Sequence, residues 1–317
     1  MEKRPLGNSG LQVAPLAFGG NVFGWTANEK TSFELLDAFT DAGFNLIDTA
    51  DNYSHWAPGN KGGESETIIG NWLKQSGKRH KVVIATKVGG AFPGGKKDLS
   101  KKYILKAAED SLRRLQVETI DLYQSHWDDE VTPVSETIDA YAQLVKEGKV
   151  KAIGASNLSP QRLQQSIDYS KEANLPQYQT LQPEYNLYNR QKFEQEYKAI
   201  CERENLGVIN YYALASGFLS GKYRTAADAA KSARGAGIVK EYLNERGLRI
   251  LKALDSVAEK HNTNAATVSL AWLMAQPLIT APIASATSVA QLQELIKATE
   301  IKLSADDLTE LDSASAY

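Results

Sequence analysis

Four side chains of the sequence could together protonate and polarise a carbonyl oxygen. Three of them end apolar segments: Asp48, Lys87 and His126; the fourth, Tyr53, follows Asp48 by five residues. A phenol has an ordinary pKa of about 10, so it donates a proton readily at neutral pH only where a nearby cation stabilises its anion. We expect Lys87 to be that cation and Asp48 to anchor it, while His126 donates a hydrogen bond to the carbonyl oxygen. The spacing therefore predicts a site that transfers a proton through Tyr53.

These side chains belong to a repeated unit, in which a short apolar run is followed by a polar connection and a helix. That alternation predicts parallel strands, and solidly apolar runs are typical of strands that are covered on both faces. Eight strands predict a (β/α)8 barrel, whose active residues lie at the carboxyl ends of the strands. We expect one domain over residues 1–317, because barrels of about 250 residues or more form a single unit. The candidate strands are 16–18, 45–48, 82–87, 120–126, 152–156, 180–182, 207–210 and 279–283.

Capping residues mark where the helices begin between these strands. Thr31 and Glu34 predict a capping box for the first barrel helix, and Gly43 predicts its end. Residues with the same role predict further helix starts at Ser100, Thr132 and Ser159.

Two segments fall outside the repeat. Residues 1–15 predict a β-hairpin with its turn at 7–10, which could close the floor of the barrel. Residues 225–245 form the longest interruption, rich in Ala, Gly and Lys, and predict a mobile flap before a helix that starts at Arg246.

Composition narrows the classes of partner. The formal net charge is −2, from 36 basic and 38 acidic residues. The sequence has no stripe of basic residues of the kind that binds a phosphate backbone, so we do not expect nucleic acid as a partner. The sequence contains no run of 18 apolar residues that would predict a membrane span, and the opening MEKRPLGNSG lacks an apolar leader. We therefore expect a cytoplasmic protein. Cys201 is the only cysteine, which we interpret as a packed thiol, and we expect no metal site.

Six motifs, in order, resemble those of the aldo-keto reductase family, in its bacterial branch that is similar to potassium-channel β subunits. They are GFNLIDTADNY, VVIATKVG, LYQSHW, GASN, LQPEYN and LASGFLSGKY, and they extend over nearly the whole chain. The resemblance implies that Asp48, Tyr53, Lys87 and His126 form the catalytic tetrad. It further implies NAD(P)H-dependent, reversible reduction of aldehydes or ketones, with a hydride from nicotinamide C4 and a proton from Tyr53. A small carbonyl compound would be the substrate, bound by Tyr53 and His126 together with Trp25 and Trp127.

The resemblance also implies NADP as cofactor, with NAD possible. Its nicotinamide end would contact one set of residues: Gly20, Asn21, Asp48, Ser156, Asn157, Gln182 and Tyr211, the last by stacking. Its diphosphate would contact Leu214, Ser216, Gly217 and Lys222, and its adenosine end Ser285, Thr287, Gln291 and Glu294. The family often has a basic residue where this sequence has Thr287, so charge-assisted bonds to a 2′-phosphate are fewer and the preference for NADPH should be modest.

Other readings stay open or are set aside. A regulatory subunit would bind the cofactor without turnover, and a barrel lyase would use Lys87 as a Schiff-base nucleophile. Tyr188 and Lys192 form a YxxxK pair typical of short-chain dehydrogenases, but no GxGxxG motif accompanies it. GFLSGKY lacks the spacing of a phosphate P-loop. The individual substrate and the oligomeric state do not follow from the sequence.

Overall fold

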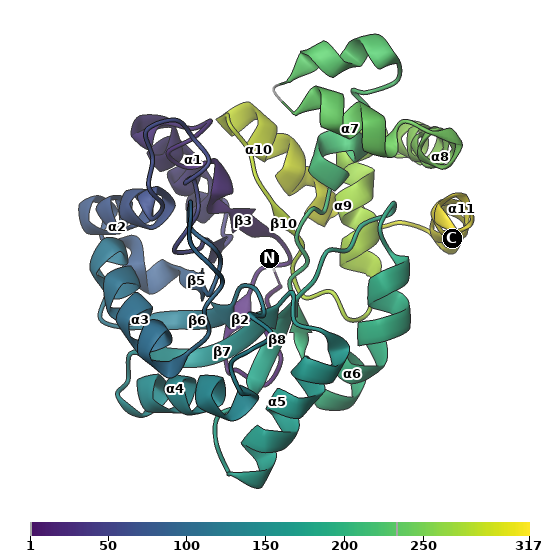
Figure 1. The fold of residues 1–317 in the computed structure, drawn as a ribbon. Helices are drawn as coiled ribbons and strands as arrows, with labels where there is room; N and C mark the ends of the chain where they lie inside the picture. Colours follow the sequence, from purple (N-terminus) through teal and green to yellow (C-terminus); the bar gives the residue numbers. More distant parts are fainter. Residues whose placement is uncertain (1, 233) are drawn as a thin grey trace.

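The centre of the molecule is a sheet of eight parallel strands, seen in a computed structural model that describes residues 2–232 and 234–317 (Figure 1). Neighbouring strands are hydrogen-bonded in the order β10-β3-β4-β5-β6-β7-β8-β9. All eight lie within or beside the ranges predicted from the apolar runs. Their bounds are β3 Ala17–Gly19, β4 Leu46–Asp48, β5 Val83–Val88, β6 Ile120–Ser125, β7 Val150–Ser156, β8 Tyr178–Gln182, β9 Gly207–Val208 and β10 Ile283–Ala284.

Backbone hydrogen bonds between the two ends of this sheet close it into a barrel. The segment that leads into β10 pairs with the last strand in the order, β9, because Thr280 N donates to Val208 O over 2.8 Å and Ile283 N donates to Asn210 O over 2.9 Å. On its other side β10 pairs with β3. The prediction of a (β/α)8 barrel is therefore confirmed.

Helices surround the strands on the outside of the barrel (Figure 1). Their apolar faces pack on the outward-facing side chains of the strands, as expected of amphipathic helices. The α-helices are α1 Glu29–Asp41, α2 Glu64–Ser76, α3 Lys101–Leu115, α4 Val134–Lys146, α5 Pro160–Glu172, α6 Lys198–Glu204, α7 Gly235–Tyr242, α8 Glu245–Lys260, α9 Ala265–Ala275, α10 Val289–Ile296 and α11 Ala305–Ser315. Short 3-10 turns are η1 Gly20–Val22, η2 Lys78–Lys81, η4 Ala215–Ser220, η5 Ala226–Lys231 and η6 Lys297–Glu300, and a π-helical turn, η3 Phe193–Tyr197, leads into α6.

The predicted hairpin is present and closes the end of the barrel at which the strands begin. Its strands are β1 Arg4–Pro5 and β2 Gln12–Val13, paired antiparallel. Leu6 and Val13 are buried among the residues that fill the barrel interior. Gly7 has φ of +56°, and a Cβ there would lie 2.2 Å from Gln179 O, so only glycine fits this approach. Asn205 Nδ2, beyond α6, donates to Asn8 Oδ1 in the hairpin turn over 2.6 Å.

Two of the predicted helix starts were wrong, by a few residues. Helix α1 begins three residues earlier than expected, because Asn28 is the N-cap and its side chain accepts the Thr31 N–H over 2.9 Å. Thr31 therefore lies inside the helix. Helix α4 has Pro133 as its N-cap, while the Thr132 hydroxyl bonds Asp129 instead. The caps at Ser100 and Ser159 are confirmed.

The segment 225–245, which the sequence predicted as a mobile flap, contains regular helical elements. It contains η5, which begins with a capping box between Thr225 and Asp228, and helix α7. Ile238 and Tyr242, four residues apart on α7, are both buried, which gives this short helix a packed face. Asn244 caps α8, which starts at Glu245, one residue before the predicted start. In the described part of the chain, no helix is both long and apolar enough to cross a bilayer.

Candidate active site

A hydrogen-bonded cluster around Lys87 lies at the carboxyl ends of β4 and β5. The Lys87 ammonium is fully buried and donates three bonds of 2.8 Å each, to Asp48 Oδ2, to Thr49 O and to Tyr53 Oη. An ammonium has three protons, so each has one acceptor here. The structure therefore brings together three of the four residues predicted for proton transfer.

The pKa of Tyr53 is raised well above its ordinary value, first by burial and then by the nearby Asp48 carboxylate. The sequence predicted a lowered pKa, because it took account of the cation and not of the desolvation of the phenol or of the carboxylate that accompanies the cation. Burial also lowers the pKa of Lys87, against the opposing effect of Asp48. Tyr53 is consequently a neutral phenol at pH 7, with its proton available for donation.

His126 follows β6, and its ring lies 5.9 Å from the Tyr53 ring, centroid to centroid. Burial, and then the charge of Lys87, lower the pKa of His126 well below its ordinary value, so the imidazole is neutral at pH 7. Its Nδ1 is buried and has no hydrogen-bond partner among the residues that the structure describes, and a Cβ on Gly90 would come within 2.8 Å of that atom. The fourth predicted residue thus lies beside Tyr53 as a neutral group that can donate one hydrogen bond.

The residues expected at the nicotinamide end are connected to Asp48 and to one another. Gln182 Nε2 donates to Asp48 Oδ1 over 2.8 Å, and the Ser156 hydroxyl donates to Gln182 O over 2.7 Å. Asn157 Nδ2 donates to Ser156 Oγ, and its Oδ1 accepts from the Tyr211 hydroxyl, both over 2.9 Å. These bonds fix the side chains in a single arrangement next to the proton-transfer cluster.

The expected diphosphate segment has the geometry of a backbone turn beside a cation. Ser216 and Gly217 have φ of +57° and +96°, and a Cβ on Gly217 would lie 3.8 Å from Lys222 Nζ in otherwise open space. No carboxylate within the described ranges forms an ion pair with Lys222. Leu214 begins this turn, because its carbonyl accepts the Gly217 N–H over 2.8 Å. A left-handed turn beside an ammonium is a suitable place for an anion such as a diphosphate.

The strand β3 and the segment after β10 approach each other at the site. Ser285 Oγ lies 2.8 Å from Gly19 O and 2.7 Å from Asn21 Oδ1. A Cβ on Gly20 would lie 3.0 Å from Asp48 O, so the backbone packs closely there.

Further along the segment after β10, the side chains expected at the adenosine end of the cofactor bond mostly to other protein groups. Gln291 Oε1 accepts the backbone N–H and the hydroxyl of Thr287, over 2.9 and 3.0 Å. Glu294 accepts from Asn264 over 3.0 Å and from Lys297. These contacts leave Thr287 as an exposed hydroxyl where a phosphate-binding cation is frequent in the resembling family.

Aromatic rings surround Tyr53 on its solvent side. The Trp56 ring lies 6.0 Å from the Tyr53 ring and 5.7 Å from the Trp25 ring, and Trp127 lies 6.2 Å from His126, all between centroids. Trp56 and Trp127 are 42% and 39% exposed, which is high for tryptophan and leaves part of each ring in contact with solvent. The predicted substrate site included Trp25 and Trp127. Trp56 was considered as a pocket residue and left out, because it follows Tyr53 in an irregular turn where no periodicity shows orientation.

The fold and these groups agree with the comparisons with known proteins. A family model described as "Aldo/keto reductase family" matches residues 15–316. The chain belongs to the aldo/keto reductase family. Three of its relatives, each matched over nearly its full length, carry different names.

The uncharacterized oxidoreductase YrpG of Bacillus subtilis is 34% identical and matches 98% of this chain and 95% of the relative. The probable voltage-gated potassium channel subunit beta of Arabidopsis thaliana is 30% identical, over 95% of this chain and 92% of the relative. The L-glyceraldehyde 3-phosphate reductase of Escherichia coli K12 is also 30% identical, over 98% and 92%. Membership of the family supports carbonyl reduction as the general chemistry.

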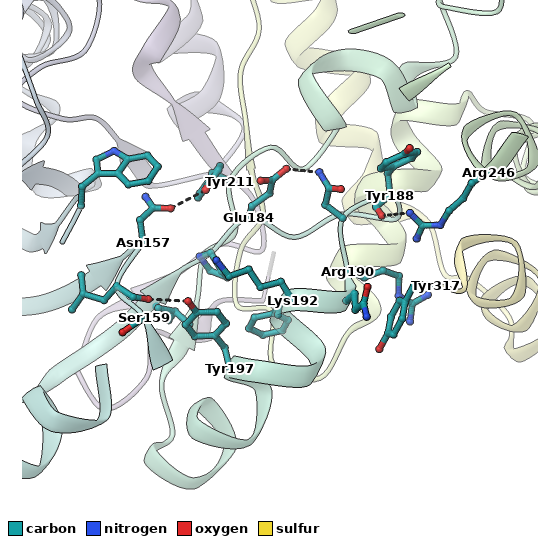
Figure 2. A pocket seen from close by; sticks show the side chains of 17 residues that line it. Asn157, Ser159, Glu184, Tyr188, Arg190, Lys192, Tyr197, Tyr211, Arg246 and Tyr317 are labelled. Carbon is teal, nitrogen blue, oxygen red and sulfur yellow. Dashed lines mark hydrogen bonds between the residues drawn. The ribbon is translucent and has the colours of Figure 1, made fainter. Parts of the chain in front are cut away.

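This aldo/keto reductase also has a cavity of about 560 Å³ beside the site (Figure 2). Trp127 is among its lining residues. Asn157 and Tyr211 line it on the side of the predicted site, and Arg246 and Tyr317 lie at its far end. Sequence reasoning missed the cavity, because segments far apart in the chain enclose it. Tyr188 and Lys192, the YxxxK pair, are among its lining residues.

Cys201 of the aldo/keto reductase is fully buried, and burial raises the pKa of its thiol to about 12. A thiol with such a pKa is protonated at neutral pH and is a poor nucleophile. The interpretation of Cys201 as a packed thiol is confirmed.

Proposed function

We propose that the protein reduces aldehydes or ketones to alcohols, reversibly, with Tyr53 as the proton donor. The observation that carries the proposal is the contact of 2.8 Å between Tyr53 Oη and the buried ammonium of Lys87. A bound nicotinamide cofactor supplies the hydride to the carbonyl carbon. The Tyr53 hydroxyl gives its proton to the carbonyl oxygen, and the His126 imidazole holds that oxygen by a hydrogen bond.

Lys87 and Asp48 act on this proton transfer through charge. As the proton leaves, negative charge develops on Tyr53 Oη, 2.8 Å from the Lys87 ammonium, which stabilises it. Asp48 holds that ammonium in place by the ion pair of 2.8 Å. A raised pKa in the resting state keeps the donor protonated until a carbonyl oxygen is present to accept the proton.

We infer NADP as the cofactor, with NAD also accepted. Three observations support a nicotinamide dinucleotide of either kind: the fixed amides of Asn157 and Gln182 beside Asp48, the open face of the turn at Gly217, and the Lys222 ammonium, which pairs with no carboxylate in the described ranges. The ring of Tyr211 would stack on the nicotinamide. Residues 1–317 would act as one domain around this site.

The test is a spectrophotometric screen of NADPH and NADH oxidation. The carbonyl compounds are aromatic aldehydes, methylglyoxal, pyridoxal, sugar aldehydes and L-glyceraldehyde 3-phosphate, the last because a relative is named for it. Turnover of at least one compound by the wild type, and its loss in Tyr53→Phe, is the expected result. Turnover that survives Tyr53→Phe would assign the proton to another group.

A second candidate is a cofactor-binding regulatory subunit, favoured by the likeness to potassium channel subunits named from plants. A pure binder would retain cofactor and fail the whole screen. A lyase that uses Lys87 as a Schiff-base nucleophile is disfavoured, because the Lys87 amine is fully buried and each of its protons has an acceptor.

A further inference from the structure

Tyr53 lies in the middle of a continuous row of rings that has a cation at each end. From Tyr53 the row passes in one direction to His126 and Trp127, at centroid spacings of 5.9 and 6.2 Å. Lys97 Nζ lies 4.9 Å from the centroid of the Trp127 ring and ends this arm.

The other arm passes from Tyr53 through Trp56 to Trp25, at spacings of 6.0 and 5.7 Å. Arg234, in the turn just before α7, ends it 5.6 Å from the centroid of the Trp25 ring. The row is therefore a chain of mostly edge-to-face ring contacts, with the proton donor inside it and an exposed cation at each end.

Neither terminal cation is neutralised by the protein. Lys97 and Arg234 are exposed, and no carboxylate in residues 2–232 and 234–317 forms an ion pair with either of them. The cation–π contact of an exposed ammonium is weak, so Lys97 can still bind an anion. The single carboxylate of the tetrad, Asp48, is buried and already bonded to Lys87 and Gln182.

Lys97 and Arg234 lie in segments with different proposed ligands. Arg234 follows the turn at 214–222 along the chain, which the proposed function assigns to the cofactor diphosphate. Lys97 lies in the connection between β5 and α3, for which no cofactor contact is proposed, and it covers the ring that follows His126 in the sequence. The arm that ends at Lys97 is thus free of proposed cofactor contacts, and its ring, Trp127, is one of the two tryptophans expected to bind the substrate.

We propose that the substrates are planar aromatic aldehydes or ketones with an anionic group, and that Lys97 binds that group. The inference rests on the proposed function, because it places the carbonyl at Tyr53 and His126. The aromatic ring of the substrate packs along Trp127, and its carboxylate, sulfonate or phosphate meets the Lys97 ammonium. The anionic group takes no part in the reaction, so Lys97 determines specificity and is not a catalytic residue.

The experiment compares each acid with its own neutral ester. The pairs are 4-formylbenzoate and the longer 4-formylcinnamate, each against its methyl ester, with saturating NADPH. In the wild type, kcat/KM for the acid should exceed that for the ester by about tenfold in at least one pair, a typical effect of one charge-assisted hydrogen bond. Lys97→Gln should remove this difference through KM of the acid, with kcat and the ester unchanged.

Two control variants separate local charge from overall charge. Lys96→Gln deletes the neighbouring exposed lysine, which has no ring contact in the described structure, and should leave the ratio of acid to ester as in the wild type. Arg234→Gln should change the affinity for NADPH and not that ratio. Equal kcat/KM for acid and ester in both pairs, or an equal loss for both in Lys97→Gln, would overturn the proposal.

Binding without turnover distinguishes this proposal from the proposed function. Calorimetric titration of the NADP⁺-loaded protein with each acid and ester measures Kd where no reduction occurs. Tighter binding of the acid that is lost in Lys97→Gln, with no turnover of any pair or of any compound of the wider screen, would contradict carbonyl reduction and keep the anion site. Turnover of the esters without a Lys97-dependent preference for the acids would contradict only the anion site.

Discussion

Lys87 and Tyr53 are joined by a hydrogen bond of 2.8 Å between a buried ammonium and a phenol whose pKa is raised. The cation does not lower the pKa of the resting phenol below its ordinary value, because burial and the Asp48 carboxylate act in the opposite direction. Its effect is largest on the developing phenolate. The attraction between the Lys87 ammonium and the Tyr53 oxygen is therefore stronger in the transition state than in the resting protein.

Tyr53→Phe should remove nearly all reductase turnover while cofactor affinity stays close to that of the wild type. The variant keeps the ring and its contact with Trp56 and deletes only the proton donor. Steady-state kinetics and fluorescence titration with NADPH measure the two effects. Tyr169→Phe makes the same chemical change on the surface of α5 and should retain full activity. A kcat within about threefold of the wild type in Tyr53→Phe contradicts the assignment.

Lys87→Met should abolish turnover and also destabilise the fold. The substitution leaves Asp48 buried without its cation, a change that typically costs about 3–5 kcal/mol. Urea unfolding measures the stability and NADPH oxidation the activity. The double variant Lys87→Met/Asp48→Asn should recover much of the stability and none of the activity. A single variant as stable as the wild type would show that Asp48 is not dependent on Lys87.

Asp51→Asn should stabilise the protein increasingly as the pH rises. Both carboxylate oxygens of Asp51 are buried without a hydrogen-bond partner in the described structure, and burial, followed by Glu66, raises its pKa well above 3.8. Between the unfolded and the folded pKa, only the unfolded state loses the proton, so wild-type stability falls by up to about 1.4 kcal/mol per pH unit.

Urea unfolding of both proteins from pH 5 to pH 7 measures this difference. It should grow with pH in favour of the Asp51→Asn variant. Asp168→Asn, on the exposed face of α5, provides the control and should show a small difference that does not change with pH. A difference between the wild type and Asp51→Asn that is constant over the range would mean that Asp51 is not protonated in the folded state.

Asn28→Ala should destabilise the protein by about 1 kcal/mol, because it removes the side-chain acceptor of the first turn of α1. Thr31→Ala, at the residue that the sequence indicated as the cap, should cost less than about 0.5 kcal/mol. Thermal and urea unfolding of the two variants decide between the positions. A larger loss of stability in Thr31→Ala than in Asn28→Ala would show that Thr31 is the N-cap of α1.

The wild type should bind NADPH more tightly than NADH by about one order of magnitude, or ~1.4 kcal/mol. Neutral donors such as the hydroxyls of Thr287 and Ser288 contribute only about 0.5–1.5 kcal/mol each, less than a charged donor. Thr287→Arg should widen the gap. Fluorescence titration of both proteins with both cofactors provides the measurement. Tighter binding of NADH by the wild type, or no gain in affinity for NADPH in Thr287→Arg, would show that the 2′-phosphate does not bind at this segment.

The barrel and the position of the tetrad could be predicted from local information. Each strand is a solid apolar run, and Asp48, Lys87 and His126 end or follow such runs, so the topology alone places them at one rim. Tyr53 could be added only through its motif. The direction of its pKa shift could not be predicted, because burial depends on side chains contributed by several strands.

The errors came from competition between nearby signals. Asn28 and Thr31 are both good N-caps, and the sequence does not show which of them has the extended backbone that a cap requires. In 225–245 the abundance of Ala and Gly concealed the spacing of Ile238 and Tyr242 that packs α7. The cavity beside Asn157 and the contact between Lys97 and Trp127 depend on loops, whose conformations carry no periodic signal.

The hairpin at the barrel floor has a consequence for synthesis on the ribosome. Gly7 packs against Gly207, and Arg4 donates to Met274 O and Ile279 O, so residues of the hairpin are in contact with residues translated about 200 to 275 positions later. Contacts of such separation form late, because the intervening chain must be ordered first. The nascent hairpin must therefore wait for most of the polypeptide to emerge, and Leu6 and Val13 stay exposed to chaperones until then.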